Sequence, residues 1–209
     1  DQAIMIDNAS NVLGNLVITQ VASGNSSPGA VSIRETDANG ITQGAAWTTH
    51  GATTLNSGAG NSIALTNPNN VLGPLQLLGA TAADRSVTIF AKDGDGHAAI
   101  FDAGANGVWD TGYTRLVAYD ATGASAGAGD IEVTQAGNAM GDLFLRGDAV
   151  SIREDSAITD SATEAWITTG TTTLNAGANA IALDNVTNVL GALAVAGTPS
   201  SVLITANSP

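Results

Sequence analysis

The densest group of side chains that could do chemistry lies between residues 93 and 110. Part of this segment follows the spacing of a calcium-binding loop, with Asp102, Asn106, Gly107 and Asp110 at positions 1, 5, 6 and 9. Positions 3 and 12 hold Gly104 and Tyr113 instead of carboxylates, so two central ligands are missing. Calcium is the only cofactor that the sequence indicates, and a plain acidic, glycine-rich loop is the interpretation that we favour. The candidate ligands are Asp93, Asp95, Asp102, Asn106 and Asp110.

Catalysis has little support in the residue types. The chain has two histidines, and we expect His50 on an exposed face and His97 in a solvated loop. Some parallel β-helix proteins cleave polysaccharides with clustered carboxylates, and the segment 93–110 is the only dense cluster of that kind. We therefore expect no enzyme, and we keep a polysaccharide-active β-helix as an alternative.

Charge limits the partners. Six basic residues face 19 acidic ones, which gives a net charge of −13, and Lys92 is the only lysine. Binding to nucleic acid needs a basic surface, so nucleic acid is excluded, and for the same reason we do not expect an anionic membrane surface as a partner. The acidic surface keeps a glycine-rich chain in solution.

The chain carries no sign of a membrane span or of a disulfide framework. It has no cysteine, and no apolar run approaches the roughly 18–20 residues that cross a bilayer. No signal peptide stands at the start, and both ends fall inside repeated segments. We therefore expect an internal segment of a longer protein that is not transmembrane.

One segment recurs four times along the chain. Ile4 to Gly14 returns at Ile63, at Ile131 and at Ile181, and each copy carries Asn and Gly three residues apart. The four Asn residues are spaced 59, 68 and 50 residues apart. A second echo is displaced by 119 residues: Ser32-Ile33-Arg34-Glu35 returns as Ser151-Ile152-Arg153-Glu154, and Trp47 returns as Trp166. The sequence is therefore that of a repeat protein, with units at about 3–61, 62–129, 130–179 and 180–209 and a glycine- and aspartate-rich insertion at about 91–129.

Apolar residues alternate at period two in short runs that Gly, Asn, Asp and Pro punctuate, which is the pattern of β-strands. Immunoglobulin-like sandwiches need about 100 residues and seven distinct strands per unit, more than each unit offers. We predict an all-β chain folded as a right-handed parallel β-helix (β-solenoid), whose coils stack in register. Narrow coils hold branched aliphatic residues well, which agrees with the low aromatic content of 4%.

The repeated Asn and Gly are predicted at the corners of the coils. Asn can bond backbone groups at a turn and stack on its equivalents as an amide ladder, and Gly can supply a positive φ. We expect a structural role for these residues and also expect Trp47, Trp109 and Trp166 to pack at corners, with sugar stacking as the alternative. The predicted corner residues are Asn11, Gly14, Asn70, Gly73, Asn138, Gly141, Asn188 and Gly191.

The alternation also predicts which side chains point inward. Their neighbours, such as Arg34, Gln76 and Glu132, should face solvent. The inward set is Ile4, Ile6, Leu16, Ile18, Ile33, Ile63, Leu65, Leu75, Leu77, Ile89, Ile131, Val133, Leu143, Leu145, Ile152, Ile181, Leu183, Leu193 and Val195.

At this point the residues resemble a known family. The strings GTTTLNAGANAIALDNVTNVLGALAVAG (170–197) and HGATTLNSGAGNSIALTNPNNVLGPLQLLG (50–79) are similar to repeats of the large filamentous-haemagglutinin-like exoproteins and adhesins of the two-partner-secretion or autotransporter type. The resemblance covers most of the chain and is weakest over about 91–129. It implies a right-handed β-helix shaft, export to the bacterial cell surface or the extracellular space, and a role in adhesion, biofilm or contact. It supplies no catalytic residues.

From these observations we expect a structural or adhesive shaft segment of a secreted bacterial surface fibre. A shaft segment without caps leaves unpaired strand edges at its ends, so we expect end-to-end association, either between chains or within a longer parent chain. A host or neighbour-cell surface or a glycan is the expected outside partner. A calcium-dependent surface-array or matrix protein is the third interpretation.

Overall fold

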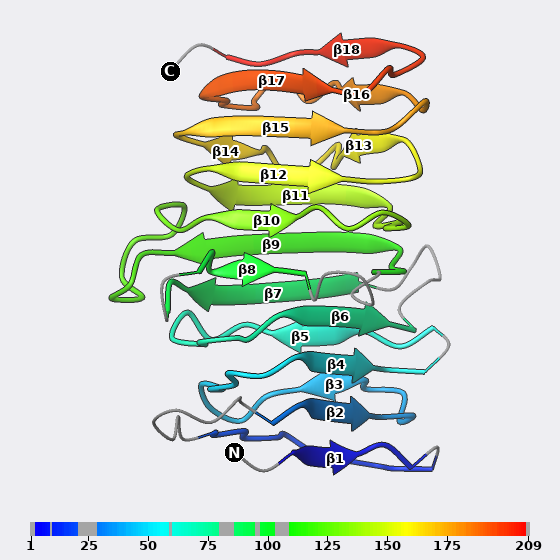
Figure 1. The fold of residues 1–209 in the computed structure, drawn as a ribbon, viewed down its shortest axis with the longest axis vertical. Helices are drawn as coiled ribbons and strands as arrows, with labels where there is room; N and C mark the ends of the chain where they lie inside the picture. The colour runs from blue at the N-terminus through cyan, green and yellow to red at the C-terminus, as the bar shows by residue number, and fades with distance from the viewer. Residues whose placement is uncertain are drawn as a thin grey trace.

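The protein is a stack of parallel β-coils, seen in a computed structural model that describes residues 3–8, 10–20, 29–58, 60–79, 86–94, 97–102 and 109–207. Figure 1 shows the coils piled along the long axis, with the N-terminus at one end and the C-terminus at the other. Strands of the nearer face run to the right and those of the farther face to the left while the chain rises, so the coil is right-handed. No helix is present in these ranges, and the predicted parallel β-solenoid is confirmed.

Three sheets form the two main faces. The second face is one continuous ladder, whereas the first consists of two sheets that a single bridge between Leu75 and Asp102 joins. The first face consists of β1 (Ile4–Ile6), β2 (Val31–Arg34), β4 (Thr53–Asn56), β6 (Leu75–Leu78), β8 (Ile100–Phe101), β10 (Ile131–Val133), β12 (Val150–Arg153), β15 (Thr171–Asn175) and β17 (Ala192–Ala196). The second face consists of β3 (Ile41–Thr42), β5 (Ile63–Leu65), β7 (Ser86–Lys92), β9 (Tyr113–Tyr119), β11 (Asp142–Gly147), β13 (Ile158–Asp160), β16 (Ile181–Leu183) and β18 (Val202–Ile204), with β14 (Ile167–Thr168) beside β11.

The coil is shorter than the sequence repeat. Val31 pairs with Thr53 and Thr53 with Leu75, so each of these coils advances the chain by 22 residues. Copies spaced 50 to 68 residues apart therefore hold more than one coil each. The same motif consequently begins on different faces, because Ile4 and Ile131 lie on the first face and Ile63 and Ile181 on the second.

The 119-residue echo, in contrast, repeats a position in the solenoid. Val31 of β2 and Val150 of β12 begin strands of the same face, five rungs apart. The partners also correspond, since Val31 pairs with Thr53 and Val150 with Thr172. Equivalent residues in this echo therefore face equivalent surroundings, which allows them to be compared as matched pairs.

Residues 91–129 continue the ladder although the sequence pattern lapses there. β8 and β9 lie in this stretch, and β9 pairs with β7 on one side and β11 on the other. The coil is longer here, because Ile100 pairs with Ile131, 31 residues further on. Of the described residues in this coil, 120–129 lie outside the strands, and the ladder continues past them.

The core is a column of aliphatic side chains between the faces. Fourteen of the predicted inward residues are buried, from Ile18 to Leu183. The prediction is wrong for Leu193 and Val195, which are 38% and 41% exposed, and it holds only in part for Ile4, Ile6 and Leu16, which are half-buried. These five residues belong to the first and last coils, where only one neighbouring coil covers them. Of the predicted outward residues, Glu132 is exposed, whereas Arg34 and Gln76 are half-buried between neighbouring strands.

Candidate functional site

The repeated Asn joins each coil to a tryptophan of the coil before it. In three copies the Asn side chain is fully buried, and its Oδ1 accepts the backbone N–H of the Trp at 2.7–2.8 Å. The Asn amide group also donates, from Asn70 to the carbonyl of Phe90 and from Asn138 to that of Arg153. These contacts join neighbouring coils, and the structural role of the corner residues stays a prediction. The pairs are Trp47 with Asn70, Trp109 with Asn138 and Trp166 with Asn188.

The same tryptophans reach back to the preceding coil. Each indole Nε1 donates to the carbonyl of the Leu that follows a motif glycine: Leu16 at 2.9 Å, Leu75 at 3.0 Å and Leu143 at 2.7 Å. All three rings are fully buried, so they pack at corners as predicted and offer no face to a sugar. One Trp thus bonds the coil below through its ring and the coil above through its backbone.

The motif Asn residues do not stack on one another as predicted, but bond other polar side chains of neighbouring coils. No two of the motif Asn residues bond each other among the contacts of the described residues, because successive copies are more than one coil apart. Asn70 instead exchanges two bonds with Gln43 of the coil before it, and Asn188 donates to Asp160 at 2.6 Å. The half-buried Asn11 donates to the carbonyls of Ile6 and Arg34.

The motif glycines are needed mainly for space. The expected positive φ occurs at Gly141, at 64°, but not at Gly14, Gly73 or Gly191. A Cβ at Gly73 would overlap the carbonyl oxygen of Gly51, and one at Gly191 that of Gly170. Coils therefore approach too closely at these corners for a side chain, whereas a Cβ at Gly14 in the first coil would meet nothing within 4 Å.

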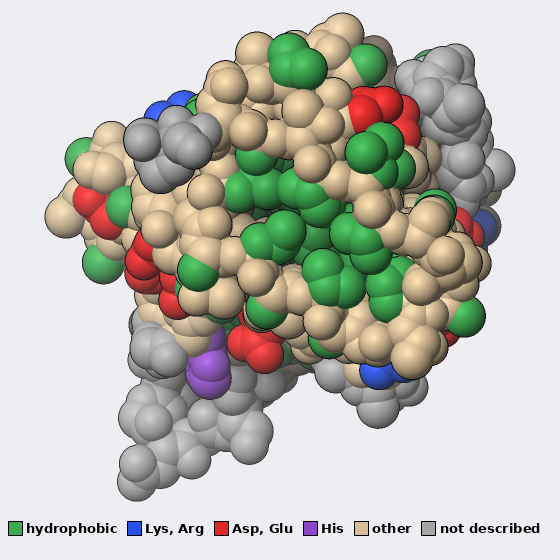
Figure 2. All heavy atoms as spheres, turned by 90° about the horizontal axis from the view of Figure 1, so that it is seen from above, with side chains coloured by type: hydrophobic (Ala, Val, Ile, Leu, Met, Phe, Trp, Pro, Cys, Tyr) green, Lys and Arg blue, Asp and Glu red, His purple; other side chains and the backbone are tan. Residues whose placement is uncertain are grey.

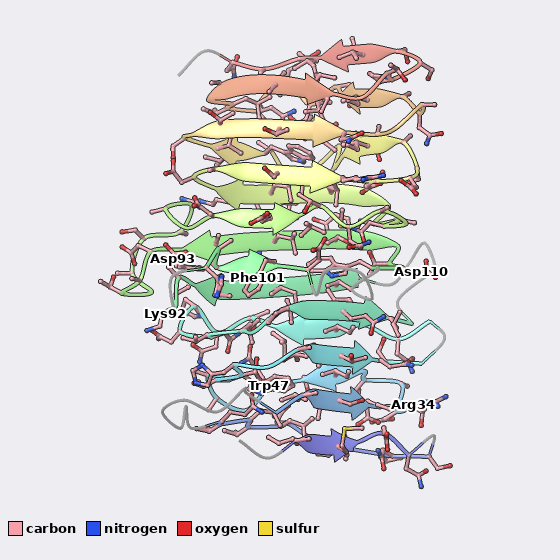
Figure 3. All side chains as sticks on the ribbon, viewed as in Figure 1. Arg34, Trp47, Lys92, Asp93, Phe101 and Asp110 are labelled. Carbon is pink, nitrogen blue, oxygen red and sulfur yellow. The ribbon has the colours of Figure 1, made fainter. Side chains whose placement is uncertain are left out.

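The candidate calcium ligands are only partly visible. Asp95 and Asn106 lie outside the described residues. Asp102 is half-buried, and its Oδ2 accepts the backbone N–H of Gln135 at 2.5 Å. Figure 3 shows Asp93 and Asp110 on opposite sides of the stack. Within the described ranges no group of three or more Asp, Glu or His side chains could hold a metal ion, and the calcium loop stays a prediction.

The carboxyl group of Asp93 lies near two other acidic residues, Asp130 and Asp120. Burial and the charge of Asp130 raise its pKa above the ordinary value, and the charge of Asp120 adds to this, while a bond to the backbone of Asp130 acts in the opposite direction. Its Oδ1 is buried and has no hydrogen-bond partner among the described residues.

The histidines are held by local contacts. The exposed His97 ring stacks on Phe101, with centroids 5.3 Å apart. His50 is half-buried, and its backbone N–H donates to Oε1 of Gln20 at 2.8 Å.

No helix in the described ranges is long and apolar enough to cross a membrane.

Sequence reasoning missed an aromatic and charged cluster outside the second face. The guanidinium carbon of Arg115 lies 4.9 Å from the ring centroid of Phe90 and 4.6 Å from that of Phe144, so β9 is tied to β7 and β11. Arg115 Nε donates to Glu164 at 3.1 Å, and the Tyr113 hydroxyl bonds the same carboxylate. The three strands bring together residues more than 20 positions apart in sequence, so no spacing could have predicted the cluster.

Sequence reasoning also left the repeated glutamates unassigned. Glu35 and Glu154 close the two copies of Ser-Ile-Arg-Glu, and both are buried, with 1% and 0% of their surface exposed. The Glu35 carboxylate accepts three backbone N–H groups, those of Leu13, Thr36 and Asp37 at 2.5–2.9 Å. The repetition of a charged residue two positions after an inward Ile, and so on the same side of the strand, was the available signal.

The last coil presents an apolar surface. Figure 2 looks down on this end and shows hydrophobic side chains gathered in its middle, ringed by polar groups. β17 and β18 are the edge strands of their sheets, and their inward positions are Leu193, Val195, Val202 and Ile204. Val202 is 48% exposed, while Ile181, its neighbour in the coil below, is fully buried. We call these four residues the open C-terminal end.

The comparisons with known proteins give a family and nothing more specific. Residues 1–78 and 128–197 match a family described as repeats of unknown function, DUF5649. No curated protein and no solved structure matches the chain. The unmatched centre, 79–127, holds much of the stretch where the sequence pattern lapses.

Proposed function

The chain belongs to the DUF5649 repeats, and we propose that it is a structural shaft segment of a secreted bacterial surface fibre, which elongates by stacking coil on coil. One observation carries the proposal: a ladder of parallel strands stacks coil on coil along the described chain. Such a ladder is the architecture of a quasi-one-dimensional protein, in which every coil contacts only its neighbours.

Stiffness along the axis supports the shaft role. The strands of neighbouring coils bond parallel to the long axis, and the Asn–Trp–Leu contacts tie three successive coils at their corners. Bending the rod would stretch buried hydrogen bonds, which are costly to leave unmade. A shaft that holds a contact site away from a cell surface needs this property.

The adhesive role and the location rest on the resemblance to filamentous-haemagglutinin-like exoproteins. On this proposal the protein lies outside the cell, catalyses no reaction, and meets a host cell, a neighbour cell or a surface glycan. Its acidic character, with a net charge of −13, suits a soluble exported rod.

We propose that the open C-terminal end stacks on a further coil, which is either the first coil of a second copy or a coil of a longer parent chain. The contact is head to tail, because only that arrangement continues the parallel register, and such a contact forms open filaments. The first coil is suited to it, since its inward Ile4 and Ile6 are only half-buried and β1 is an edge strand.

Leu193→Asp tests the contact, with Ala194→Asp as its matched control. Leu193 lies at an inward position of the last coil and Ala194 at an outward one, so the same charge is added one residue apart. The wild type should increase in mass with concentration in light scattering and form filaments by electron microscopy. Leu193→Asp should stay monomeric, and Ala194→Asp should resemble the wild type. A wild type that stays monomeric at every concentration would show that no second copy covers this end.

A further inference from the structure

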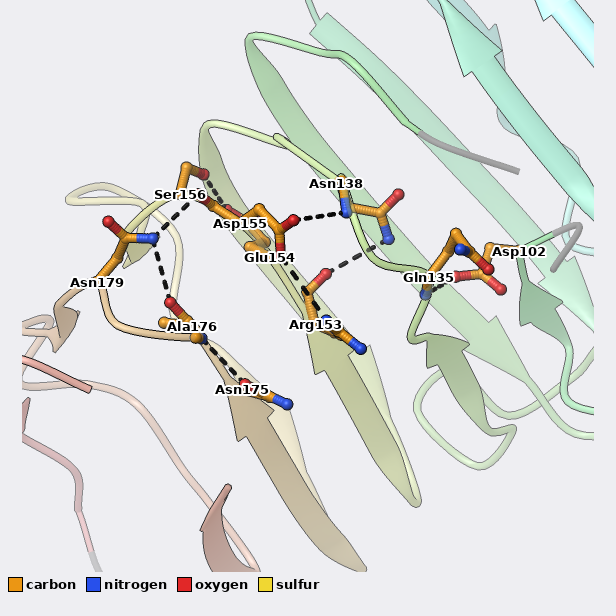
Figure 4. Close-up of polar contacts among 12 residues, drawn as sticks. Asp102, Gln135, Asn138, Arg153, Glu154, Asp155, Ser156, Asn175, Ala176 and Asn179 are labelled. Atoms are coloured by element: carbon orange, nitrogen blue, oxygen red, sulfur yellow. Dashed lines mark hydrogen bonds and ion pairs between the residues drawn. The ribbon is translucent and has the colours of Figure 1, made fainter. Parts of the chain in front are cut away.

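Glu154 is a buried acid without the contacts that its counterpart has. Figure 4 shows it at the end of β12, between the corner Gln135–Gly141 of one neighbouring coil and the corner Asn175–Asn179 of the other. Its side chain is fully buried, its Oε2 accepts the Ser156 hydroxyl at 2.7 Å, and its Oε1 has no hydrogen-bond partner among the described residues.

Glu35 is the internal reference. It lies 119 residues earlier, on the same face, above the equivalent corner: the N–H of Thr36 bonds the carbonyl of Asn11 as that of Asp155 bonds Asn138. Glu35 replaces lost water with three backbone donors, whereas Glu154 has one hydroxyl in hydrogen-bond contact and the Met140 amide as its one further donor. A buried carboxylate with so few donors is costly, and the neutral acid is not.

No charge offsets this burial. The corner before Glu154 reads Gln-Ala-Gly-Asn-Ala-Met-Gly and the corner after it Asn-Ala-Gly-Ala-Asn, so neither contributes a charged side chain. Arg153 and Asp155 flank Glu154 in sequence and lie 3.9 Å from each other as an exposed pair. Burial raises the pKa of Glu154 to about 7, with the Ser156 hydroxyl and the Met140 amide acting in the opposite direction.

We propose that Glu154 is a proton-operated joint in the solenoid: the neutral carboxyl group closes the corner between β12 and the coil of β10, and its ionisation loosens that corner. The joint is independent of the proposed fibre function, because it concerns contacts within one chain. In a rod, the joint would make the stability of one coil depend on pH, while Glu154 would leave the stability of the other coils unchanged.

The sign of the effect follows from the two protonation equilibria. The folded protein holds its Glu154 proton up to about pH 7, while the unfolded chain loses it near the ordinary value of 4.5. Between these values the folded state binds more protons, so this group makes the free energy of unfolding decrease as the pH rises. The stabilisation is complete below the lower value and is lost above the higher one.

Melting temperatures of the wild type, Glu154→Gln and Glu35→Gln at about pH 5.5 and about pH 8.5 test the proposal. Glu154→Gln should melt several degrees above the wild type at the higher pH, because it cannot ionise, and close to it at the lower pH. Glu35→Gln should melt lower at both, because an amide has one acceptor oxygen for three N–H donors. An equal difference between Glu154→Gln and the wild type at both pH values would overturn the joint.

Two measurements on the wild type keep the test decisive if a variant does not fold. The carboxyl carbon of Glu154 should titrate in NMR near neutral pH, and a midpoint at the ordinary value would contradict the proposal. The Asp155 amide, which bonds the carbonyl of Asn138 at 2.9 Å, should lose protection from hydrogen exchange at least about tenfold on ionisation, after correction for intrinsic exchange. Unchanged protection would show that ionisation does not loosen the corner.

Discussion

At each corner with a buried Trp, one Asn side chain makes two kinds of contact. Its side-chain oxygen satisfies the N–H of a buried Trp, and its amide group satisfies a carbonyl of another coil. The N–H of Trp109 is buried, so the polar Asn stabilises the corner although it lies inside an aliphatic column. The turn sets the position of the Asn, and the contacts with neighbouring coils set how much it stabilises the protein.

Asn138→Ala should lower the free energy of unfolding by about 1–3 kcal/mol, because it leaves the N–H of Trp109 buried without an acceptor. Urea denaturation measures the change. Asn179→Ala is the control: it removes an Asn that also bonds two carbonyls but is exposed, so water replaces it at little cost. Equal losses in the two variants would show that burial of the Trp contact is not the cause.

At the scale of the element, the distance between coils decides which residues the corners tolerate. Gly73 and Gly191 lie where the backbone of one coil touches that of the next, and their φ values are not in the left-handed region. The glycine is therefore selected by the packing of coils and not by the conformation of the turn. Gly141 carries both constraints, since it has a positive φ and its Cβ would overlap the carbonyl oxygen of Gly112.

Gly73→Ala should destabilise the protein by about 1–3 kcal/mol, since the added carbon forces two backbones apart. Gly14→Ala, the same change in the same motif, should be neutral or stabilising by about 0.4–1 kcal/mol, because its Cβ meets nothing and the unfolded chain loses freedom. Thermal melts of both variants measure the contrast. A loss at Gly14 as large as that at Gly73 would point back to turn conformation.

The cluster around Arg115 shows how strands of one face are joined from outside. Its guanidinium group lies between two Phe rings and holds a carboxylate from the loop after β13, so it links three rungs and a loop. The contact depends on a flat cation with a fixed fork of donors, which Lys does not provide. It reinforces the widest part of the ladder, where β7 and β9 each run for seven residues.

At the scale of the whole molecule, net charge opposes end-to-end association and the apolar open C-terminal end favours it. Two copies that meet end to end each bring a net charge of −13, while their apolar coils attract. Repulsion over long distances is screened by salt, with a Debye length of about 30 Å at 0.01 M and about 8 Å at 0.15 M.

Association of the wild type should therefore be stronger at about 0.15 M NaCl than at about 0.01 M, because screening weakens the repulsion more than the apolar contact. Light scattering across a concentration series measures it. Leu193→Asp should remain monomeric at both salt concentrations. Association that weakens as salt is added would mean that opposite charges, and not the open end, hold the copies together.

The sequence alone determined the class of fold and the role of the corners. Period-two alternation of Ile, Leu and Val can bury one face of a strand only, and frequent Gly and Asn leave no room for long helices, so a parallel solenoid with structural Asn corners could be predicted from local pattern. The inward residues followed for the same reason, with Ile33 and Leu145 as examples.

Only the tertiary structure decided which residues meet across coils. The register places Trp109 against Asn138 and Glu154 against the corner of Met140, and coil lengths that vary between 17 and 31 residues hide this register from any fixed spacing. Leu193 and Val195 carry the same pattern as buried residues but are exposed, because burial depends on a neighbouring coil and not on the strand itself. Alternation determines the direction in which a side chain points, and the stacking of coils determines its contact partners and its burial.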